Sequence, residues 1–296
     1  MSTSWSIYVI ALVAANIIGC VWLLVANRKS KTGGEGESVG HEFDGIEELN
    51  TPMPGWWIWM FWITIAFAIA YLLAFPGLGN YAGFLGWTSI QQYETEIASA
   101  DAQYGPLFAG FYATPVPDLL GDDQAIEIGS RLFANNCAIC HGSDARGGRH
   151  YPNLTDDDWL YGGTPEIIVQ TVTDGRNGVM PPLGAAIGGE QGVREMAQHV
   201  LSLSGRKHDA AMAAVAAPKF QTLCAVCHGP TGTGNQAMGA PNLTDDIWLH
   251  GGRVEHIEEQ ITLGRNNQMP AHRDILTPEK IHLVALYVYS LSNSKQ

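Results

Sequence analysis

The sequence CAICHG occupies residues 137–142, and the closely similar CAVCHG occupies residues 224–229. A second matching segment follows each one, PNLTDDDWLYGG from Pro152 and PNLTDDIWLHGG from Pro241. A third follows in turn, GRNGVMPP from Gly175 and GRNNQMPAH from Gly264. The spacing of the three segments differs between the two copies only by short insertions. Their simplest interpretation is two tandem domains of one fold, each about 85–90 residues long.

Cys-x-x-Cys-His is the attachment signature of c-type haem. Cysteines three apart on a first helical turn share a face and can form thioethers to the same haem. Cys137 and Cys140 are the candidates for one haem, and Cys224 and Cys227 for another. The adjacent His141 or His228 then faces the iron as the proximal ligand. A zinc site usually places its CxxC pairs about 15–20 residues apart, far closer than these. A thioredoxin-type motif requires a βαβ pattern, which is absent from the sequence.

Met180 and Met269 are the candidates for the opposite axial position. A methionine is more often core filling than a ligand, but these two align in the repeat, each directly before Pro181 or Pro270. The proline fixes an extended backbone that holds the thioether over the iron. A thioether opposite histidine raises the potential, and six-coordinate iron favours electron transfer over substrate binding. The sequence therefore predicts no catalytic residue.

Arg176 and Arg265 recur four residues before these methionines, and they are candidate contacts to haem propionates through a guanidinium fork. Surface arginine is an equally good interpretation. Trp159 and Trp248 also recur, and we expect them to pack against the haem edge. The remaining histidines have no matched role in the repeat and are expected to be surface or core residues: His150, His199, His208, His250, His256, His272 and His282.

Apolar residues at helical spacing predict helices at residues 124–135 and 211–223, leading into the two motifs. Residues 194–203 and 280–291 form the expected closing helix of each copy, and Thr277-Pro278 is a start signal for the last one. No strand alternation is evident. The expected fold is all-α, with N-terminal transmembrane helices followed by two tandem class I-like cytochrome c domains.

Two stretches without charge, at about residues 5–26 and 55–77, are long enough to span a bilayer. The basic residues Arg28, Lys29 and Lys31 follow the first stretch, which favours an uncleaved anchor over a signal peptide. The same residues predict a cytoplasmic loop at 27–54 with both termini outside. Cys20 is expected to be a buried small hydrophobe. The tryptophans Trp56, Trp57, Trp59 and Trp62 suit an interfacial belt or a contact with another membrane helix.

The expected organisation is a membrane anchor at 1–79, a linker at 80–118 over the outer membrane face, and cytochrome domains at 119–206 and 207–296. The loop between the spans is expected to be a mobile connector. The net charge is −13, which makes the chain a poor candidate for nucleic-acid binding. The part of the chain after the second span contains 13 basic and 23 acidic residues. This excess of negative charge suits a basic protein partner.

Membrane anchoring followed by tandem CxxCH and Met-Pro modules resembles the di-haem cytochrome c subunit of cbb3-type cytochrome c oxidases. The resemblance covers nearly the whole chain, although two spans match only some members. It implies two covalently bound haems c held by Cys137, Cys140, Cys224 and Cys227, with His141, Met180, His228 and Met269 at the irons. It also implies a location in the bacterial inner membrane, with the haem domains in the periplasm.

The resemblance further implies a non-catalytic subunit of a proton-pumping respiratory oxidase. Electrons enter from a donor cytochrome c and continue to a mono-haem c subunit and to the haem–copper subunit that reduces oxygen. Three alternatives remain open at this stage. They are a free membrane-anchored carrier, a cytochrome subunit of another respiratory or dehydrogenase complex, and a di-haem peroxidase. The matched methionines disfavour the peroxidase, because it requires an open iron.

Overall fold

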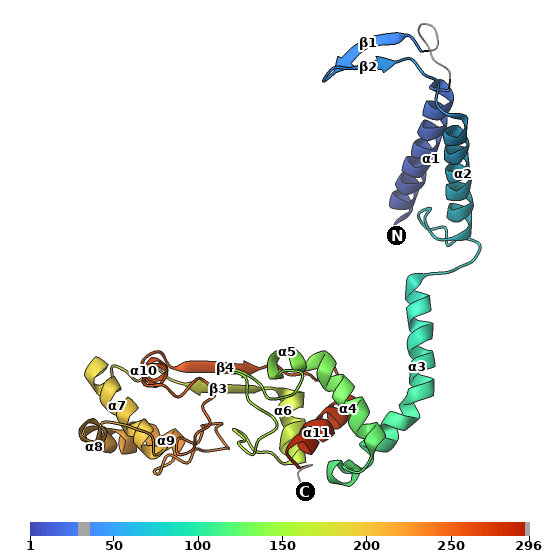
Figure 1. Cartoon of the computed structure of the whole chain (residues 1–296). Helices are drawn as coiled ribbons and strands as arrows, with labels where there is room; N and C mark the ends of the chain where they lie inside the picture. The colour runs from blue at the N-terminus through green and yellow to red at the C-terminus, as the bar shows by residue number, and fades with distance from the viewer. Residues whose placement is uncertain (29–35, 294–296) are drawn as a thin grey trace. The chain divides into compact units, whose positions relative to one another are not determined.

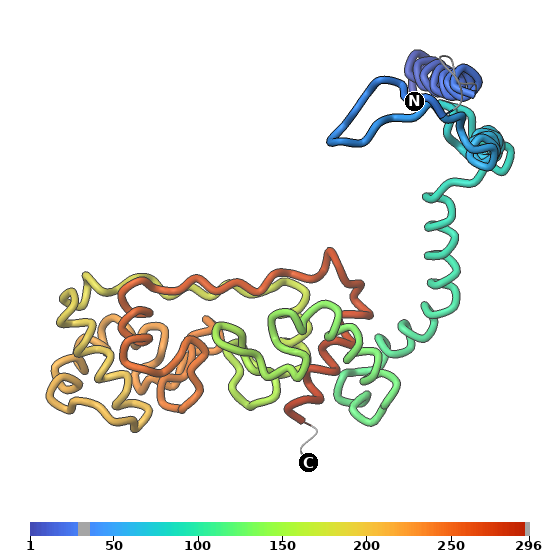
Figure 2. The backbone as a smooth tube through the Cα atoms, turned by 45° about the horizontal axis from the view of Figure 1, so that its top comes forward, coloured from blue at the N-terminus to red at the C-terminus, as the bar shows by residue number. Residues whose placement is uncertain are grey.

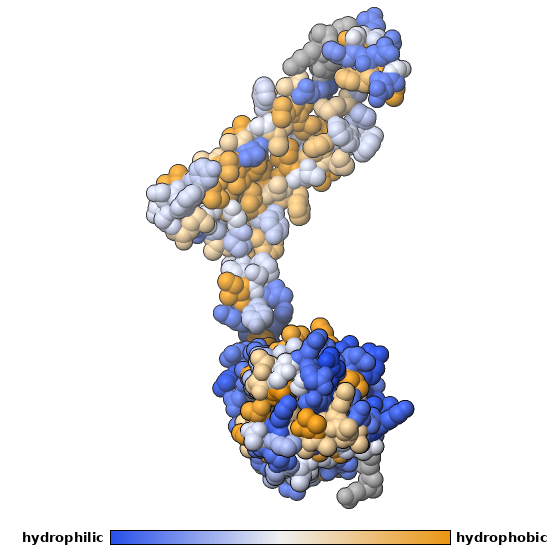
Figure 3. Space-filling view, turned by 90° about the vertical axis from the view of Figure 1, so that its left-hand side faces the viewer, coloured by the Kyte–Doolittle hydropathy of each residue, from blue (hydrophilic) through white to orange (hydrophobic). Residues whose placement is uncertain are grey.

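A computed structural model describes residues 1–28 and 36–293 of the chain (Figure 1). Lys29 and Lys31, which contribute to the predicted membrane orientation, lie outside the described residues. The chain divides into two compact units, Met1–Gln103 and Tyr104–Gln296. Apolar residues gather over the helices of the first unit, whereas hydrophilic residues cover much of the visible face of the second (Figure 3).

Two long apolar helices dominate the first unit, α1 (Thr3–Ala26) and α2 (Gly55–Ala74). They form over the predicted spans, and most of their side chains are exposed in the described structure. The segment after α2 returns to the start of α1, where the Asn80 amide donates to Ser6 Oγ at 2.9 Å. Gly79 has φ +59°, and a Cβ there would overlap Ser6. This glycine therefore permits the close approach.

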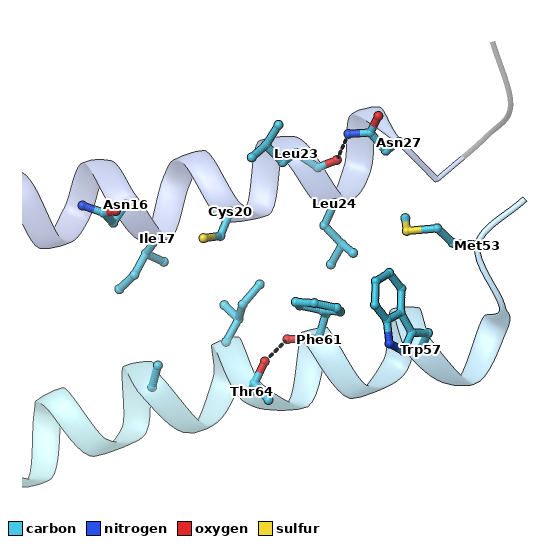
Figure 4. A pocket seen from close by; sticks show the side chains of 12 residues that line it. Asn16, Ile17, Cys20, Leu23, Leu24, Asn27, Met53, Trp57, Phe61 and Thr64 are labelled. Carbon is cyan, nitrogen blue, oxygen red and sulfur yellow. Dashed lines mark hydrogen bonds between the residues drawn. The ribbon is translucent and has the colours of Figure 1, made fainter. Parts of the chain in front are cut away.

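A groove of about 630 Å³ separates α1 from α2 (Figure 4). Cys20 lines this groove and is exposed, so the expectation of a buried cysteine is wrong for this structure. The groove is lined by α1, α2 and the segment just before α2. Leu24, Trp57 and Phe61 are among the apolar side chains that border it.

Three helices of the described chain are long and apolar enough to cross a membrane by length and composition. Two of them are α1 and α2, and the third runs from Ala210 to His228. That third helix contains Lys219 and the second CxxCH, and its Ala216 and Phe220 are fully buried among other helices of the second unit. The apolar side chains of this helix therefore pack in a protein core.

Two segments are more regular than the sequence predicted. The loop between α1 and α2 contains an antiparallel hairpin of β1 (Ser38–Phe43) and β2 (Ile46–Leu49). Its turn residues Asp44 and Gly45 both have positive φ, as a tight hairpin turn requires. The expected linker contains a 24-residue helix, α3 (Ser89–Tyr112), followed by the short helix η1 (Val116–Leu119).

The second unit carries the repeated motifs on short helices and two strands. In chain order these are α4 (Asp123–Asn136), α5 (Ala138–His141), α6 (Pro165–Asp174), β3 (Arg176–Met180), α7 (Gly189–Leu203), α8 (Ala210–Lys219), a π-helical turn η2 (Phe220–Cys224), α9 (Ala225–His228), α10 (Val254–Leu263), β4 (Arg265–Met269) and α11 (Pro278–Asn293). The predicted helical fold is confirmed, and the structure adds two short two-stranded sheets to it.

The two cores exchange their closing helices. One core joins α4 and α6 to the last helix, α11, through buried residues such as Phe133, Ile168 and Val284. The other joins α7 to α8 and α10 through Met196, Phe220 and Ile257. The helix at 194–203 was expected to close the first copy and the helix at 280–291 the second. The structure packs each against the other copy, so the boundary expected at 206/207 separates sequence copies but not packed cores.

The exchange follows from β3 and β4, which pair antiparallel (Figure 2). β3 carries the chain out of the first core, and β4 carries it back. A third cluster lies beside the first core, where Phe111 of α3 packs with Val116, Leu119 and Leu283. The end of α3 is thereby joined to α11.

Candidate haem sites

The first CxxCH motif lies where α4 ends and the short helix α5 begins. The Asp122 side chain caps α4 by accepting from the Ala125 amide at 3.0 Å, which satisfies one free N–H of the first turn. At the other end of the helix Cys137 is buried, whereas Cys140 is exposed. Ile139 between them is 93% exposed. The motif thus has one face toward the core and one toward solvent.

Each predicted proximal histidine is oriented by a proline carbonyl. Nδ1 of His141 lies 3.1 Å from the Pro152 oxygen, and Nδ1 of His228 lies 3.1 Å from the Pro241 oxygen. A carbonyl only accepts, so Nδ1 carries the proton in both rings. Nε2 is therefore the nitrogen with a free lone pair, which is the arrangement that an iron ligand requires.

The loop that supplies these carbonyls is built identically in both copies. Oδ1 of Asn153 accepts from the amide and the hydroxyl of Thr155 at 3.0 and 2.8 Å. Oδ1 of Asn242 accepts from the same groups of Thr244 at 3.0 and 2.7 Å. These Asx turns fix the backbone directly after each proline. The repeated Pro-Asn-Leu-Thr thus acts as a support for the histidine.

Burial shifts the pKa values of the histidines and of two cysteines in the motifs. It lowers the pKa of His141 and of His228, which keeps both imidazoles neutral. It also raises the pKa of Cys137 to about 11, with a further contribution from Cys140. Burial likewise raises the pKa of Cys224. A redox dithiol works through a lowered thiol pKa, so these cysteines do not resemble one.

The structure places each methionine in the core that carries the other copy's CxxCH motif. Met269 packs against the cluster that contains Phe133 and Cys137. Met180 packs against the cluster that contains Phe220, with Cys224 at its edge. Sequence order alone suggests the opposite pairing, since each methionine follows the motif of its own copy.

Two glycines allow this crossing. Gly175 has φ +72°, and a Cβ there would overlap the carbonyl oxygen of Met269. Gly264 has φ +70° and stands in the same relation to Met180. The glycine of each Gly-Arg-Asn segment therefore makes room for the Met-Pro segment of the other copy.

The paired strands fix the separation of the two methionines. Arg176 lies opposite Met269, and Met180 lies opposite Arg265, at the two ends of the ribbon. Four residues of strand separate these ends by about 13 Å. A shared two-stranded ribbon therefore links the positions of both candidate ligands.

The two arginines remain with their own copies and have different partners. Nε of Arg176 donates to Thr171 Oγ1 at 2.8 Å, and its guanidinium lies 4.7 Å from the centre of the Tyr161 ring. Arg265 forms an ion pair with Glu259 at 3.2 Å. Its Nε is buried without a hydrogen-bond partner in the described structure.

The donor groups of the second core suit a haem carboxylate. Arg265 Nε and Trp248 Nε1 are both buried donors without a protein acceptor among the described residues. Such orphaned donors are costly unless a bound group satisfies them. A haem propionate is an acceptor of the required charge. Together with the oriented histidine and a methionine in the same core, these donors fit the prosthetic group.

Sequence reasoning did not single out His272, which the structure places inside the first core. It is buried, and its backbone amide donates to the Val172 carbonyl at 3.0 Å. Its Nδ1 has no hydrogen-bond partner among the described residues. Its charge also contributes to the lowered pKa of His141. The only available signal was its position three residues after Met269.

A second pair of histidines joins the two copies. Nδ1 of His150 lies 2.7 Å from Nδ1 of His250, and the His250 ring also contacts the Asn267 amide at 3.0 Å. His150 has φ +80°, a conformation rarely adopted by a residue other than glycine. Burial, followed by the charges of His150 and Arg265, lowers the pKa of His250 to about 4.

Two cytochrome-like cores, each with an oriented CxxCH histidine and a methionine, define the chain as a c-type cytochrome preceded by apolar helices. Comparison with known families agrees. Residues 124–200 and 211–288 match the family described as cytochrome c oxidase, cbb3-type, subunit III. Residues 35–82 match the N-terminal domain of the cbb3 cytochrome oxidase protein FixP. The chain belongs to the CcoP/FixP family of cbb3-type cytochrome c oxidase subunits.

Similar proteins span nearly the same length. The CcoP subunit of Rubrivivax gelatinosus is 47% identical over 99% of this chain and 96% of its own. The CcoP subunit of Cereibacter sphaeroides is 39% identical over 88% of this chain and 97% of its own. The FixP subunit of Azorhizobium caulinodans is 38% identical over 87% of this chain and 94% of its own. The N-terminal family match begins after α1.

Proposed function

We propose that this chain is the membrane-anchored electron-transfer subunit of a cbb3-type oxidase. It receives electrons from a donor cytochrome c and passes them toward a mono-haem c subunit and the haem–copper subunit. The observation that carries this proposal is the matched pair of cores, each with a proline-oriented histidine and a packed methionine. Covalently bound haem supplies the one-electron redox chemistry at each core.

Two haems are proposed, one for each CxxCH motif. Cys137 and Cys140 would hold the first, with His141 and Met269 as the residues that would bind its iron. Cys224 and Cys227 would hold the second, with His228 and Met180 as the residues that would bind its iron. This crossed assignment follows from the clusters in which the methionines lie. A histidine and a methionine at each iron would leave no site for substrate, which supports a relay role without a catalytic residue.

The donors at the second core are proposed to bind its propionates. Trp248 Nε1 and Arg265 Nε supply two buried N–H groups. Arg176 is proposed for the first haem, where Thr171 and Tyr161 hold its guanidinium in place. Fixed donors of this kind hold the prosthetic group at a set orientation and tune its potential.

The proposed location is the bacterial inner membrane. Helices α1 and α2 form the anchor, the hairpin loop lies on the cytoplasmic side, and both termini lie in the periplasm with the haem domains. Arg28 at the end of α1 supports this orientation. The next basic residue after the hairpin loop is Arg131, so no positive charge holds the second end of α2 on the cytoplasmic side.

Purification from native membranes in mild detergent tests the proposal. We expect haem b and copper to co-purify with the chain, and the preparation to consume oxygen with reduced cytochrome c. Two c haems per chain without haem b, copper or another subunit would contradict the oxidase role and leave a tethered carrier. Optical and metal analysis of one preparation measures all of these quantities.

A further inference from the structure

Helix α3 carries an apolar stripe that repeats every seven residues. The stripe consists of residues spaced alternately three and four apart, the pattern of a coiled-coil seam; they are Ile90, Tyr93, Ile97, Ala100, Tyr104, Leu107 and Phe111. We call this set the α3 seam. Its first part is open to solvent, since Ile90 is 69%, Tyr93 is 64% and Ile97 is 44% exposed.

The last part of the α3 seam is already a helix-packing surface. Phe111 is buried, and Leu107 packs with it in the cluster formed with Val116, Leu119 and Leu283. Leu283 belongs to α11, so this end of the seam is covered by other helical residues. The same spacing continues along α3 toward Ile90, where the side chains are exposed in the described structure. A helix is therefore the shape that fits the remainder.

Acidic residues border the exposed part of the α3 seam. Glu94, Glu96 and Asp101 occupy the flanking positions that set partner choice in helix pairs. No basic residue lies anywhere on α3. A second copy of this helix would place like charges opposite one another, which disfavours self-pairing. Helices that lie on a membrane surface carry Lys and Arg toward anionic lipid, and α3 carries none.

We propose that the exposed part of the α3 seam docks an amphipathic helix with basic flanking residues, supplied by another subunit of the oxidase. Ile90, Tyr93 and Ile97 fill the apolar contact, and the three carboxylates pair with Lys or Arg of the partner. The proposal rests on the proposed function for the existence of that subunit. The docked helix stabilises the association of the chain with the oxidase beyond what α1 and α2 provide.

A pair of double variants tests the surface in the full chain. Ile90→Glu with Ile97→Glu charges the seam, and Gln91→Glu with Ala98→Glu adds the same charge at the same spacing one residue away. We expect the seam variant to lower the co-purifying haem b and copper per haem c by about tenfold or more, as for loss of a central contact. The control variant keeps the wild-type ratio.

The outcomes separate the two proposals. A wild-type chain without haem b and copper overturns the proposed function. A wild-type chain that carries both, with a seam variant that carries equally much, overturns only the docking surface. Covalent haem c content and the reduced spectrum of the seam variant are compared with those of wild type, which detects a failure to fold.

A photo-crosslinking side chain placed at Tyr93 identifies the occupant without disturbing the seam. An adduct with a Lys- or Arg-bearing segment of another oxidase subunit supports the proposal. An adduct with a second copy of this chain, or with lipid alone, overturns it. The same group placed at Thr95, on the opposite side of α3, is expected to give no protein adduct.

Discussion

Nδ1 of His141 and of His228 lies against a proline carbonyl from the loop that follows each motif. This single bond decides which ring nitrogen is available to a metal. The next residue, Asn153 or Asn242, closes a turn that holds the carbonyl in place. The repeated PNLT segment thus has a role that its position ten or more residues from the histidine does not show.

The crossed methionines give the sharpest prediction at the residue scale. The double variant Cys137→Ser with Cys140→Ser removes the first haem. In this background we expect Met180→Leu to lower the reduction potential of the remaining haem and Met269→Leu to leave it unchanged. Loss of the thioether should lower that potential by roughly 0.2 V, within the range that axial ligands span. Redox titration with optical detection measures it. Pairing within each copy would reverse the two results.

The His150–His250 contact predicts a pH-dependent stability. The pKa of His250 is about 4 in the folded chain and about 6.5 when unfolded. The unfolded state therefore binds more protons between these values, and stability falls as the pH drops from about 6.5 to about 4. Thermal unfolding followed by circular dichroism checks this. His250→Asn should flatten the slope, whereas the exposed His208→Asn should not.

His272 offers a local test of the first core. Its buried Nδ1 has no partner among the described residues, and it lies near enough to His141 to influence that pKa. We expect His272→Phe to shift the potential of the first haem while leaving that of the second unchanged. A redox titration that resolves both haems measures the change. Equal shifts at both would show a general structural effect instead.

At the scale of elements, the crossing of α4 and α11 depends on a glycine. A Cβ on Gly129 would overlap the Leu283 carbonyl oxygen and touch the Cβ of Tyr287. The corresponding position of the second core is Ala216, which is fully buried. The helix crossing thus has a glycine in the first core and an alanine at the corresponding position of the second core.

Gly129→Ala should therefore destabilise the second unit by about 1–3 kcal/mol, as overpacking does in a close contact. Gln124→Ala, on the exposed side of the same helix, is the matched control and should stay within about 0.5 kcal/mol of wild type. Denaturant unfolding monitored by haem absorbance compares them. A Gly129→Ala variant as stable as the control would show that α11 shifts to accommodate the methyl group.

The sequence predicted the helices and both motifs but not how the copies share their parts. Apolar spacing located α4, α7 and α11 because each buries one face. The exchange of α7 and α11 left no sequence signal, since both copies carry the same local pattern and either partner satisfies it. The strands β3 and β4 were missed for a similar reason, because short segments without apolar alternation pair only when the two copies meet.

The helix α3 in the expected linker was also not predicted, for a different reason. Its heptad stripe was present in the sequence, but Gly105 and Pro106 interrupt it within the helix, and they suggested irregular structure. The hairpin turn Asp44-Gly45 was equally visible as a turn signal. The composition of both segments predicts connectors, whereas the structure contains a hairpin and a long helix there.

At the scale of the whole molecule, charge and hydropathy divide the chain into parts with different surroundings. The apolar helices α1 and α2 contain no charged residue. Beyond the second span the chain has 23 acidic and 13 basic residues. A soluble surface with this excess of carboxylates produces a negative field that attracts a basic protein from a distance.

This field predicts that the rate of electron transfer from the donor cytochrome c depends on salt concentration. Electrostatic steering weakens as the screening length shortens from about 10 Å at 0.1 M to about 3 Å at 1 M salt. We therefore expect oxygen consumption with a basic cytochrome c to fall with ionic strength. A small uncharged reductant in the same preparation should show little change, because no long-range attraction brings it to the surface. A donor rate independent of salt would contradict acidic docking and leave the excess charge as a contribution to solubility.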